Sequence, residues 1–218
     1  MEGRTKLKRN FSFAGITLLI CLSVFFVGWK STQNHTQTIT FKQQEFEVFT
    51  VKNPNKIVFG YADSLGNQLN NFKNFKAFQS KKGNDLFFAV NGGMFTKTFE
   101  PQGLYIQDKI EIQSVDLDSG YGNFYLLPNG VFGLNAGKPF VLETKTLMSS
   151  SFATSIPFAT QSGPMLVVAD SIHPAFNEGS KNKQFEMELV LTKKEKWSLL
   201  SLTKKPIFTT LHNCLETN

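Results

Sequence analysis

Residues 89–106 read AVNGGMFTKTFEPQGLYI, and the interpretation of the chain depends on the turn inside this stretch. An apolar run ends on Asn91, Gly92 and Gly93, and a Met-Phe pair follows at once. Glycine permits positive φ and the close approach of a ligand or of another backbone, and an asparagine amide offers both a donor and an acceptor. The pattern indicates either a ligand-binding loop or a strand-ending turn held by the Asn91 side chain. Taken alone, the stretch favours the turn.

A second stretch of the same kind, ATQSGPMLV, occupies residues 159–167. Gln161 and Ser162 are compact polar residues, and Gly163 with the proline after it predicts a sharp bend. A nucleophilic Ser162 would need a nearby base, but no His or Asp partner is recognisable and the G-x-S-x-G motif is absent. We therefore interpret Ser162 as a hydrogen-bonding loop residue.

Three further observations concern acids, bases and metals. His173 in DSIHPAF is either a site acid or base or a turn residue packed against an aromatic ring, and the turn residue is the favoured interpretation. Glu100 follows the Gly-Gly loop and could reach a site, but a solvated loop charge is favoured. No spacing of His, Cys or carboxylates typical of metal sites occurs, so we predict no metal and no cofactor.

Local patterns predict an α+β domain with a mixed, strand-rich sheet and few helices. Alternating or short continuous apolar runs predict strands in residues 38–53, 55–66, 85–90, 136–143 and 164–176. Hairpins are expected in residues 102–115 and 122–135, the second turning at Pro-Asn-Gly. Phe72, Phe75 and Phe78 have helical spacing and predict a helix in residues 69–84 that ends at Gly83.

The first 30 residues differ in character from the rest of the chain. They contain most of the net charge of +6, and the nearly neutral body argues against a nucleic-acid partner. Basic residues precede an apolar run, residues 11–29, that is long enough to span a bilayer and would leave the body outside the cytoplasm, in the periplasm or at the cell surface. Residues 1–30 are thus a signal peptide or an N-terminal membrane anchor, and the lack of a good small-x-small cleavage site favours the anchor. Residues 31–39 are interpreted as a polar linker.

Four stretches taken together resemble the phosphodiester glycosidase family, and most closely its bacterial exported members. They are AVNGGMF, PQGLYI, GNFYLLPNG and ATQSGPMLVVADSIHPAF. The same domain occurs in the enzyme that uncovers mannose 6-phosphate tags on lysosomal proteins. The resemblance covers about residues 40–183, and it rests on the order of the motifs because each alone is weakly specific.

The resemblance implies hydrolysis of a sugar attached through a phosphodiester, in a pocket lined by the Asn-Gly-Gly and Ser-Gly-Pro loops. The substrate-binding residues carried over are Asn91, Gly92, Gly93, Gln161, Ser162 and Gly163. Backbone N–H groups of glycine-rich loops can bind anions, and neutral side chains can orient a sugar. The expected partner is a sugar phosphodiester or a glycan. The alternative is a non-catalytic, extracytoplasmic glycan-binding domain.

Two motifs of the family are missing from the chain. The family has a later strand with Arg-Asn-Gly and a final Asp-Gly motif, whereas residues 40–218 contain no Arg and residues 184–218 contain no Asp. Arginine is suited to bidentate phosphate contact, and an aspartate could serve acid–base chemistry. We therefore expect the domain in residues 40–183 to lack its C-terminal part and its activity to be impaired.

Residues 184–218 are interpreted as an out-of-frame tail. New codons can be assembled from the third base of each codon and the first two bases of the next. From Gln184 to Glu188 these codons allow only Ile or Val, then Arg or a stop, then Asn or Asp, then Gly. The missing Arg-Asn-Gly motif is thus available after a one-base shift near codon 184. The alternative is a divergent tail.

Overall fold

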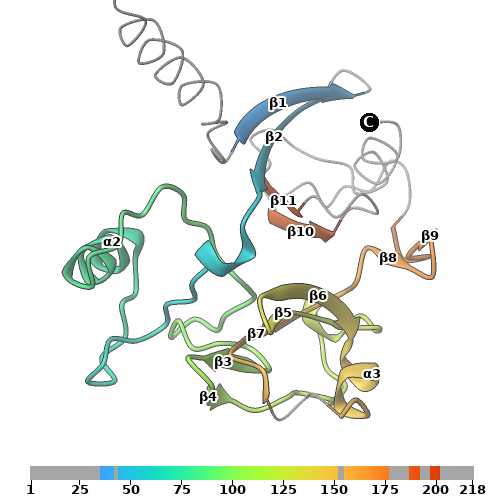
Figure 1. Ribbon diagram of the computed structural model, residues 1–218. Helices are drawn as coiled ribbons and strands as arrows, with labels where there is room; N and C mark the ends of the chain where they lie inside the picture. Colours follow the sequence, from blue (N-terminus) through green and yellow to red (C-terminus); the bar gives the residue numbers. More distant parts are fainter. Residues whose placement is uncertain (1–34, 42–43, 152–154, 177–186, 192–196, 202–218) are drawn as a thin grey trace, which may run out of the picture. The chain divides into compact units, whose positions relative to one another are not determined.

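The structure is a computed structural model that describes residues 35–41, 44–151, 155–176, 187–191 and 197–201. The chain separates into two units, Met1–Gln33 and Asn34–Asn218, and all the described residues belong to the second. These residues form antiparallel sheets with two short α-helices, which confirms the expected strand-rich α+β class (Figure 1). The predicted membrane segment, residues 11–29, lies outside the described residues, and no helix within them is long and apolar enough to cross a bilayer.

The central sheet has five strands in the order β4-β3-β7-β5-β6 (Figure 1). Their bounds are Tyr105–Gln107 for β3, Ile110–Gln113 for β4, Gly130–Asn135 for β5, Lys138–Glu143 for β6 and Phe158–Ser162 for β7. Every pairing among the described strands is antiparallel, so the mixed sheet that we expected is not found there. Parallel neighbours need long crossover connections, whereas short turns join β3 to β4 and β5 to β6.

One core cluster lies on one side of this sheet, where side chains of β3, β5 and β7 meet the short helix α3, Thr144–Met148. Its buried members are Leu104, Ile106, Val131, Leu147, Ile156 and Ala159. Leu147 comes from α3, which directly follows β6. The helix therefore packs Leu147 against the sheet directly after β6 ends.

A second sheet has four strands in the order β1-β2-β11-β10. The strands are His35–Phe41 for β1, Gln44–Val51 for β2, Met187–Leu191 for β10 and Trp197–Ser201 for β11. Residues 35–39 therefore belong to a strand rather than to the linker that we expected, because their backbones pair with β2. Two segments of the tail also form strands, which sequence analysis did not predict. The expected single strand in residues 38–53 is a hairpin.

Helix α2, Phe72–Lys81, confirms the helix that the Phe spacing predicted. The Asn71 side chain caps its first turn by accepting a hydrogen bond from the Asn74 N–H. Gly83 has φ of 77° just after the helix, and the Asn84 N–H reaches back to the Gln79 carbonyl. This is the glycine-dependent helix end that the sequence predicted.

The strands expected in residues 55–66 and 85–90 are not formed. A 3-10 turn at Pro54–Lys56 leads into irregular chain, in which Ala62 and Gln68 form an isolated bridge. Residues 85–90 have no ladder partner, and the Phe87 side chain is 74% exposed. The Phe88 ring stacks on Phe49 of β2, with centroids 4.4 Å apart. The Phe87 ring also stacks on Phe49, at 5.7 Å. An apolar run alone does not distinguish a buried strand from an irregular segment that packs through its rings.

The hairpin expected in residues 122–135 is also wrong. Asn123–Tyr125 forms a 3-10 turn, a cis peptide precedes Pro128, and β5 begins only at Gly130. Pro128 has no N–H to donate to a ladder. Strand β5 instead forms its hairpin with β6.

The last expected strand, in residues 164–176, is reduced to a small hairpin. Its strands are Val167–Val168 (β8) and Ser171–Ile172 (β9), with positive φ at Ala169 and Asp170 between them. The hairpin expected in residues 102–115 is confirmed as β3 and β4.

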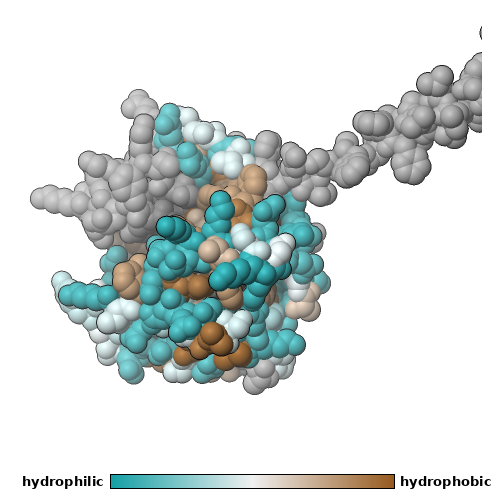
Figure 2. Space-filling model, turned by 90° about the vertical axis from the view of Figure 1, so that its left-hand side faces the viewer, coloured by the Kyte–Doolittle hydropathy of each residue, from teal (hydrophilic) through white to brown (hydrophobic). Residues whose placement is uncertain are grey.

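Apolar residues also reach the surface. One face of the molecule shows them in brown among hydrophilic residues (Figure 2).

Candidate functional site

Gln161 is the residue around which the quoted motifs gather. It lies in β7 with 1% of its surface exposed. Its Oε1 accepts hydrogen bonds from the N–H groups of Leu104 (2.9 Å) and Asp116 (3.0 Å), and its Nε2 donates to the Asp116 carbonyl oxygen (2.6 Å). One buried amide therefore joins β7 to two other segments of the chain.

Two glycines of the stretch 89–106, Gly93 and Gly103, pack against the same part of β7. A Cβ atom on Gly93 would collide with Thr160 Oγ1 and lie 3.4 Å from the Gln161 carbonyl oxygen. Gly103 has φ of 80°, and a Cβ atom there would lie 2.5 Å from Gln161 Oε1 and 2.7 Å from the Phe124 ring. Both positions require glycine because buried neighbours occupy the space that a side chain would need.

Gly163 joins the remaining motifs to this cluster. A Cβ atom on Gly163 would lie 2.5 Å from the Phe124 carbonyl oxygen and would collide with Asn129 Oδ1. The Ser-Gly-Pro bend thus packs against both GNFY and PNG. These motifs therefore meet around one point, although they come from three regions of the sequence, residues 89–103, 122–130 and 161–164.

The six predicted substrate-binding residues do not share one cavity. The structure brings Gly93, Gln161 and Gly163 into the cluster just described. Asn91 and Gly92 are exposed, and nothing lies within 4 Å of a Cβ atom built on Gly92. Ser162 is half-buried and pairs with Gly130 in the β5–β7 ladder.

A cavity of about 320 Å³ opens beside Gln161, the one predicted residue in its lining. The lining residues are Asp116, Leu117, Leu127, Pro128, Asn129, Glu143, Thr144, Lys145 and Gln161. They come from the loop after β4, the chain before β5, the junction of β6 with α3, and β7. The cavity offers two carboxylates, one ammonium group, two amides and an apolar wall.

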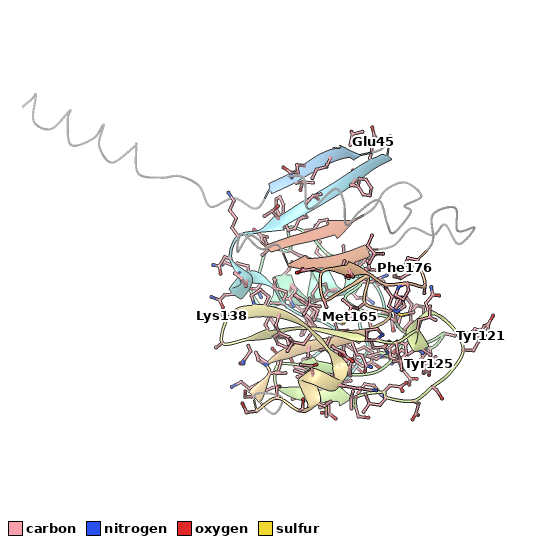
Figure 3. All side chains as sticks on the ribbon, turned by 90° about the vertical axis from the view of Figure 1, so that its right-hand side faces the viewer. Glu45, Tyr121, Tyr125, Lys138, Met165 and Phe176 are labelled. Atoms are coloured by element: carbon pink, nitrogen blue, oxygen red, sulfur yellow. The ribbon has the colours of Figure 1, made fainter. Side chains whose placement is uncertain are left out.

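The Asp116 carboxylate is fixed from three directions. Its backbone is bound by Gln161, its Oδ1 accepts the Asp118 N–H (2.9 Å), and its Oδ2 accepts the Tyr125 hydroxyl (3.3 Å). Figure 3 shows that Tyr121 projects outward and that Tyr125 lies closer to the strands. Sequence analysis missed Asp116, and the Asp-Leu-Asp pattern was its only local signal.

Asn129 is the second residue that sequence analysis missed. It is 4% exposed, and its backbone oxygen accepts both the N–H (2.9 Å) and the hydroxyl (3.0 Å) of Thr144. Its side-chain Oδ1 is buried without a hydrogen-bond partner. A buried acceptor without a partner costs about 1–3 kcal/mol. This oxygen packs against Gly163, so the cost is borne within the protein.

His173 is a turn residue, which confirms the favoured interpretation. Its Nδ1 accepts the Ala175 N–H (3.1 Å), so its Nε2 carries the proton and donates to the Leu127 carbonyl oxygen (2.8 Å). The ring also packs against Phe176, with centroids 5.5 Å apart. The residue therefore supports Leu127 in the cavity wall without lining the cavity itself.

Glu100 is exposed, as a solvated loop charge should be, and its Oε2 accepts the Thr98 hydroxyl (3.0 Å).

Burial raises the pKa of the Tyr105 hydroxyl, but this residue packs against Phe59 and Tyr61 and does not line the cavity. Within the described ranges, no group of three or more His, Cys, Asp or Glu side chains is placed to hold a metal ion.

Comparison with known proteins gives one partial similarity. No protein-family model matches the chain. Over 90 residues the sequence is 38% identical to the Escherichia coli K12 protein named "Uncharacterized protein YigE". The matched part is 39% of this chain and 34% of that relative, so the similarity spans about a third of the relative's length.

Proposed function

We propose that the chain descends from an enzyme that hydrolyses sugar phosphodiesters, of the phosphodiester glycosidase type. The observation that supports this most is the convergence of the motifs on which the resemblance rests. Gly93, Gly103 and Gly163 all pack around Gln161 and its neighbours, although they come from three separate loops. Motifs that meet in space are expected of a functional site, whereas unrelated turns would be scattered.

The cavity beside Gln161 supports binding of a small polar ligand. Its volume of about 320 Å³ is at the lower end of the range for ligand pockets, which suits a ligand of monosaccharide size. Carboxylates and amides in its lining can bind hydroxyl groups, and Lys145 can bind an anionic oxygen. In the reaction, water would add across the ester to release a free sugar and a phosphomonoester.

The charge of the cavity also supports the expectation of impaired activity. Lys145 is the cation in the lining, and it is exposed. A lysine contacts phosphate as a point charge and lacks the bidentate fork of arginine. Asp116 and Glu143 lie in the same lining and would oppose a second negative charge.

The test is hydrolysis by the full-length chain purified in detergent. The substrate is the methyl phosphodiester of N-acetylglucosamine 1-phosphate, and mass spectrometry measures free sugar and methyl phosphate. A matched preparation contains the chain with the reading frame shifted by one base near codon 184. The proposal expects the unshifted chain to release methyl phosphate slowly and the frame-shifted chain to release it faster. Release by neither preparation would contradict it.

The second candidate is glycan binding without hydrolysis. The acceptor-rich cavity and the missing arginine favour it. It predicts that neither preparation releases methyl phosphate, whereas both bind neutral sugars. The hydrolysis assay and a sugar-binding measurement together discriminate between the two candidates.

A further inference from the structure

We infer that the cavity beside Gln161 binds the hydroxyl groups of a sugar ring, with Asp116 as the ligand-contacting carboxylate and Gln161 as its positioning residue. The choice of a sugar rests on the proposed function. The choice of hydroxyl groups over a phosphate rests on the lining of the cavity itself.

The lining has more acceptors than cations. Asp116 and Glu143 contribute two carboxylates, and Asn129 contributes a side-chain amide whose Oδ1 packs against Gly163. Lys145 contributes one positive charge. A hydroxyl-bearing ligand donates to carboxylates and amides, whereas a phosphate would face two like charges. The balance therefore favours a neutral, hydroxyl-rich group.

The apolar part of the lining suits the same ligand. Leu117, Leu127 and Pro128 form a wall next to these polar groups. The C–H face of a sugar ring can pack on such a wall while its hydroxyls reach the acceptors. Small-molecule sites commonly combine apolar walls with a few polar groups in this way. Leu127 is held from behind by the hydrogen bond between its carbonyl oxygen and His173.

Asp116 is the carboxylate with the most support. Gln161 binds its N–H and its carbonyl oxygen, and Tyr125 and the Asp118 N–H bind its two carboxylate oxygens. Each of these oxygens has capacity for a further hydrogen bond. A carboxylate that is fixed before binding loses little freedom when a ligand arrives. Gln161 therefore acts on the ligand through Asp116 rather than by direct contact.

The experiment is a titration of the full-length, isotope-labelled chain in detergent, followed by NMR. N-acetylglucosamine is the first probe and inorganic phosphate is the second. We expect the sugar to shift the side-chain amide signals of Asn129 and Gln161, and phosphate to leave them unchanged. Sugar-induced shifts confined to residues 91–93, or none up to the solubility of the sugar, would overturn the inference. So would shifts of the Asn129 and Gln161 signals by phosphate alone.

Asp116→Asn tests the carboxylate itself. Asparagine keeps the shape and can still accept from Tyr125, so the fold should be retained. We expect sugar binding to weaken about tenfold, the effect of losing a charge-assisted hydrogen bond. Glu111→Gln, at an exposed position of β4 outside the cavity lining, is the matched control and should bind as the wild type does. Equal binding by Asp116→Asn and wild type would contradict the assignment.

Gln161→Met tests positioning, because it removes the three side-chain hydrogen bonds and keeps the size of the side chain. The Asp116 amide resonance should move and sugar binding should weaken, even where circular dichroism shows that the sheet is retained. If this variant does not fold, the Asp116→Asn result alone decides. Hydrolysis is measured separately: sugar binding without hydrolysis contradicts the proposed function, and hydrolysis without shifts at Asn129 contradicts this inference.

Discussion

The side-chain amide of Gln161 binds both backbone polar groups of Asp116, 45 residues earlier in the chain, at 3.0 and 2.6 Å. The residue that sequence analysis placed in contact with substrate is thus engaged with the protein's own backbone. The carboxylate that it positions lines the cavity. This relationship turns a predicted binding residue into a structural support for a different one.

The first prediction concerns the stability that Gln161 provides. Gln161→Met leaves the N–H groups of Leu104 and Asp116 without their acceptor, Gln161 Oε1. Since each unsatisfied buried group costs about 1–3 kcal/mol, we expect the free energy of unfolding to fall by about 2–4 kcal/mol. Urea unfolding followed by circular dichroism measures this change. Gln113→Met, at an exposed position of β4, should stay within about 0.5 kcal/mol of wild type.

The second prediction separates backbone strain from steric overlap at glycine. Gly66 and Gly103 have similar φ values, 85° and 80°, but only Gly103 has side chains where a Cβ atom would lie. Gly66→Ala should cost about 1 kcal/mol for the left-handed backbone alone. Gly103→Ala should cost about 2–4 kcal/mol, because it also overpacks Gln161 and Phe124. Equal costs in thermal unfolding would show that the contacts at Gly103 are not tight.

The third prediction concerns the turn at Asp63. The hydrogen bond from the Asn67 side-chain amide, 3.0 Å to Oδ2, holds the pKa of the Asp63 carboxyl below its ordinary value. The folded pKa is lower than the unfolded one, so the contribution to stability is present above the unfolded pKa and is lost as the pH falls through the folded pKa. An NMR titration should find the pKa of Asp63 higher in Asn67→Ala than in wild type. An unchanged value would rule out the Asn67 side chain as the cause.

The fourth prediction concerns the coding DNA. A one-base shift near codon 184 should give Arg-Asn-Gly and a later Asp-Gly. Resequencing the locus and translating the shifted frame decides this directly. A stop codon at the second shifted position would support a divergent tail, in which β10 and β11 are the true strands of the sheet.

Sequence analysis predicted correctly the helix and the hairpin that are determined by residues close together in the chain. The Phe spacing predicted α2, and Gly83 predicted where it ends, whereas the Asn71 cap was not predicted. The β3–β4 hairpin turns at Asp108 and Lys109, which have positive φ of 52° and 68°. The expected hairpin in residues 122–135 failed because its first arm forms a 3-10 turn at Asn123–Tyr125, which the apolar pattern alone did not reveal.

The candidate site depended on contacts that no local pattern contains. Asp116 is positioned by Gln161, and Asn129 is buried by Gly163 and Thr144, so neither role was visible from neighbouring residues. The glycines were recognised as special, but their reason differs from the one expected. Gly93, Gly103 and Gly163 make room for protein side chains and backbone rather than lining the cavity.

The pairing of β2 with β11 has a consequence for the order in which the molecule assembles. The hairpin of β1 and β2 is made early in synthesis, whereas its ladder neighbour is made near the end of the described chain. Closing such a long loop is entropically costly, and contacts of this kind slow folding. The edge of β2 that pairs with β11 therefore stays unpaired until β11 has been synthesised. During that time the nascent protein is most exposed to wrong strand pairing.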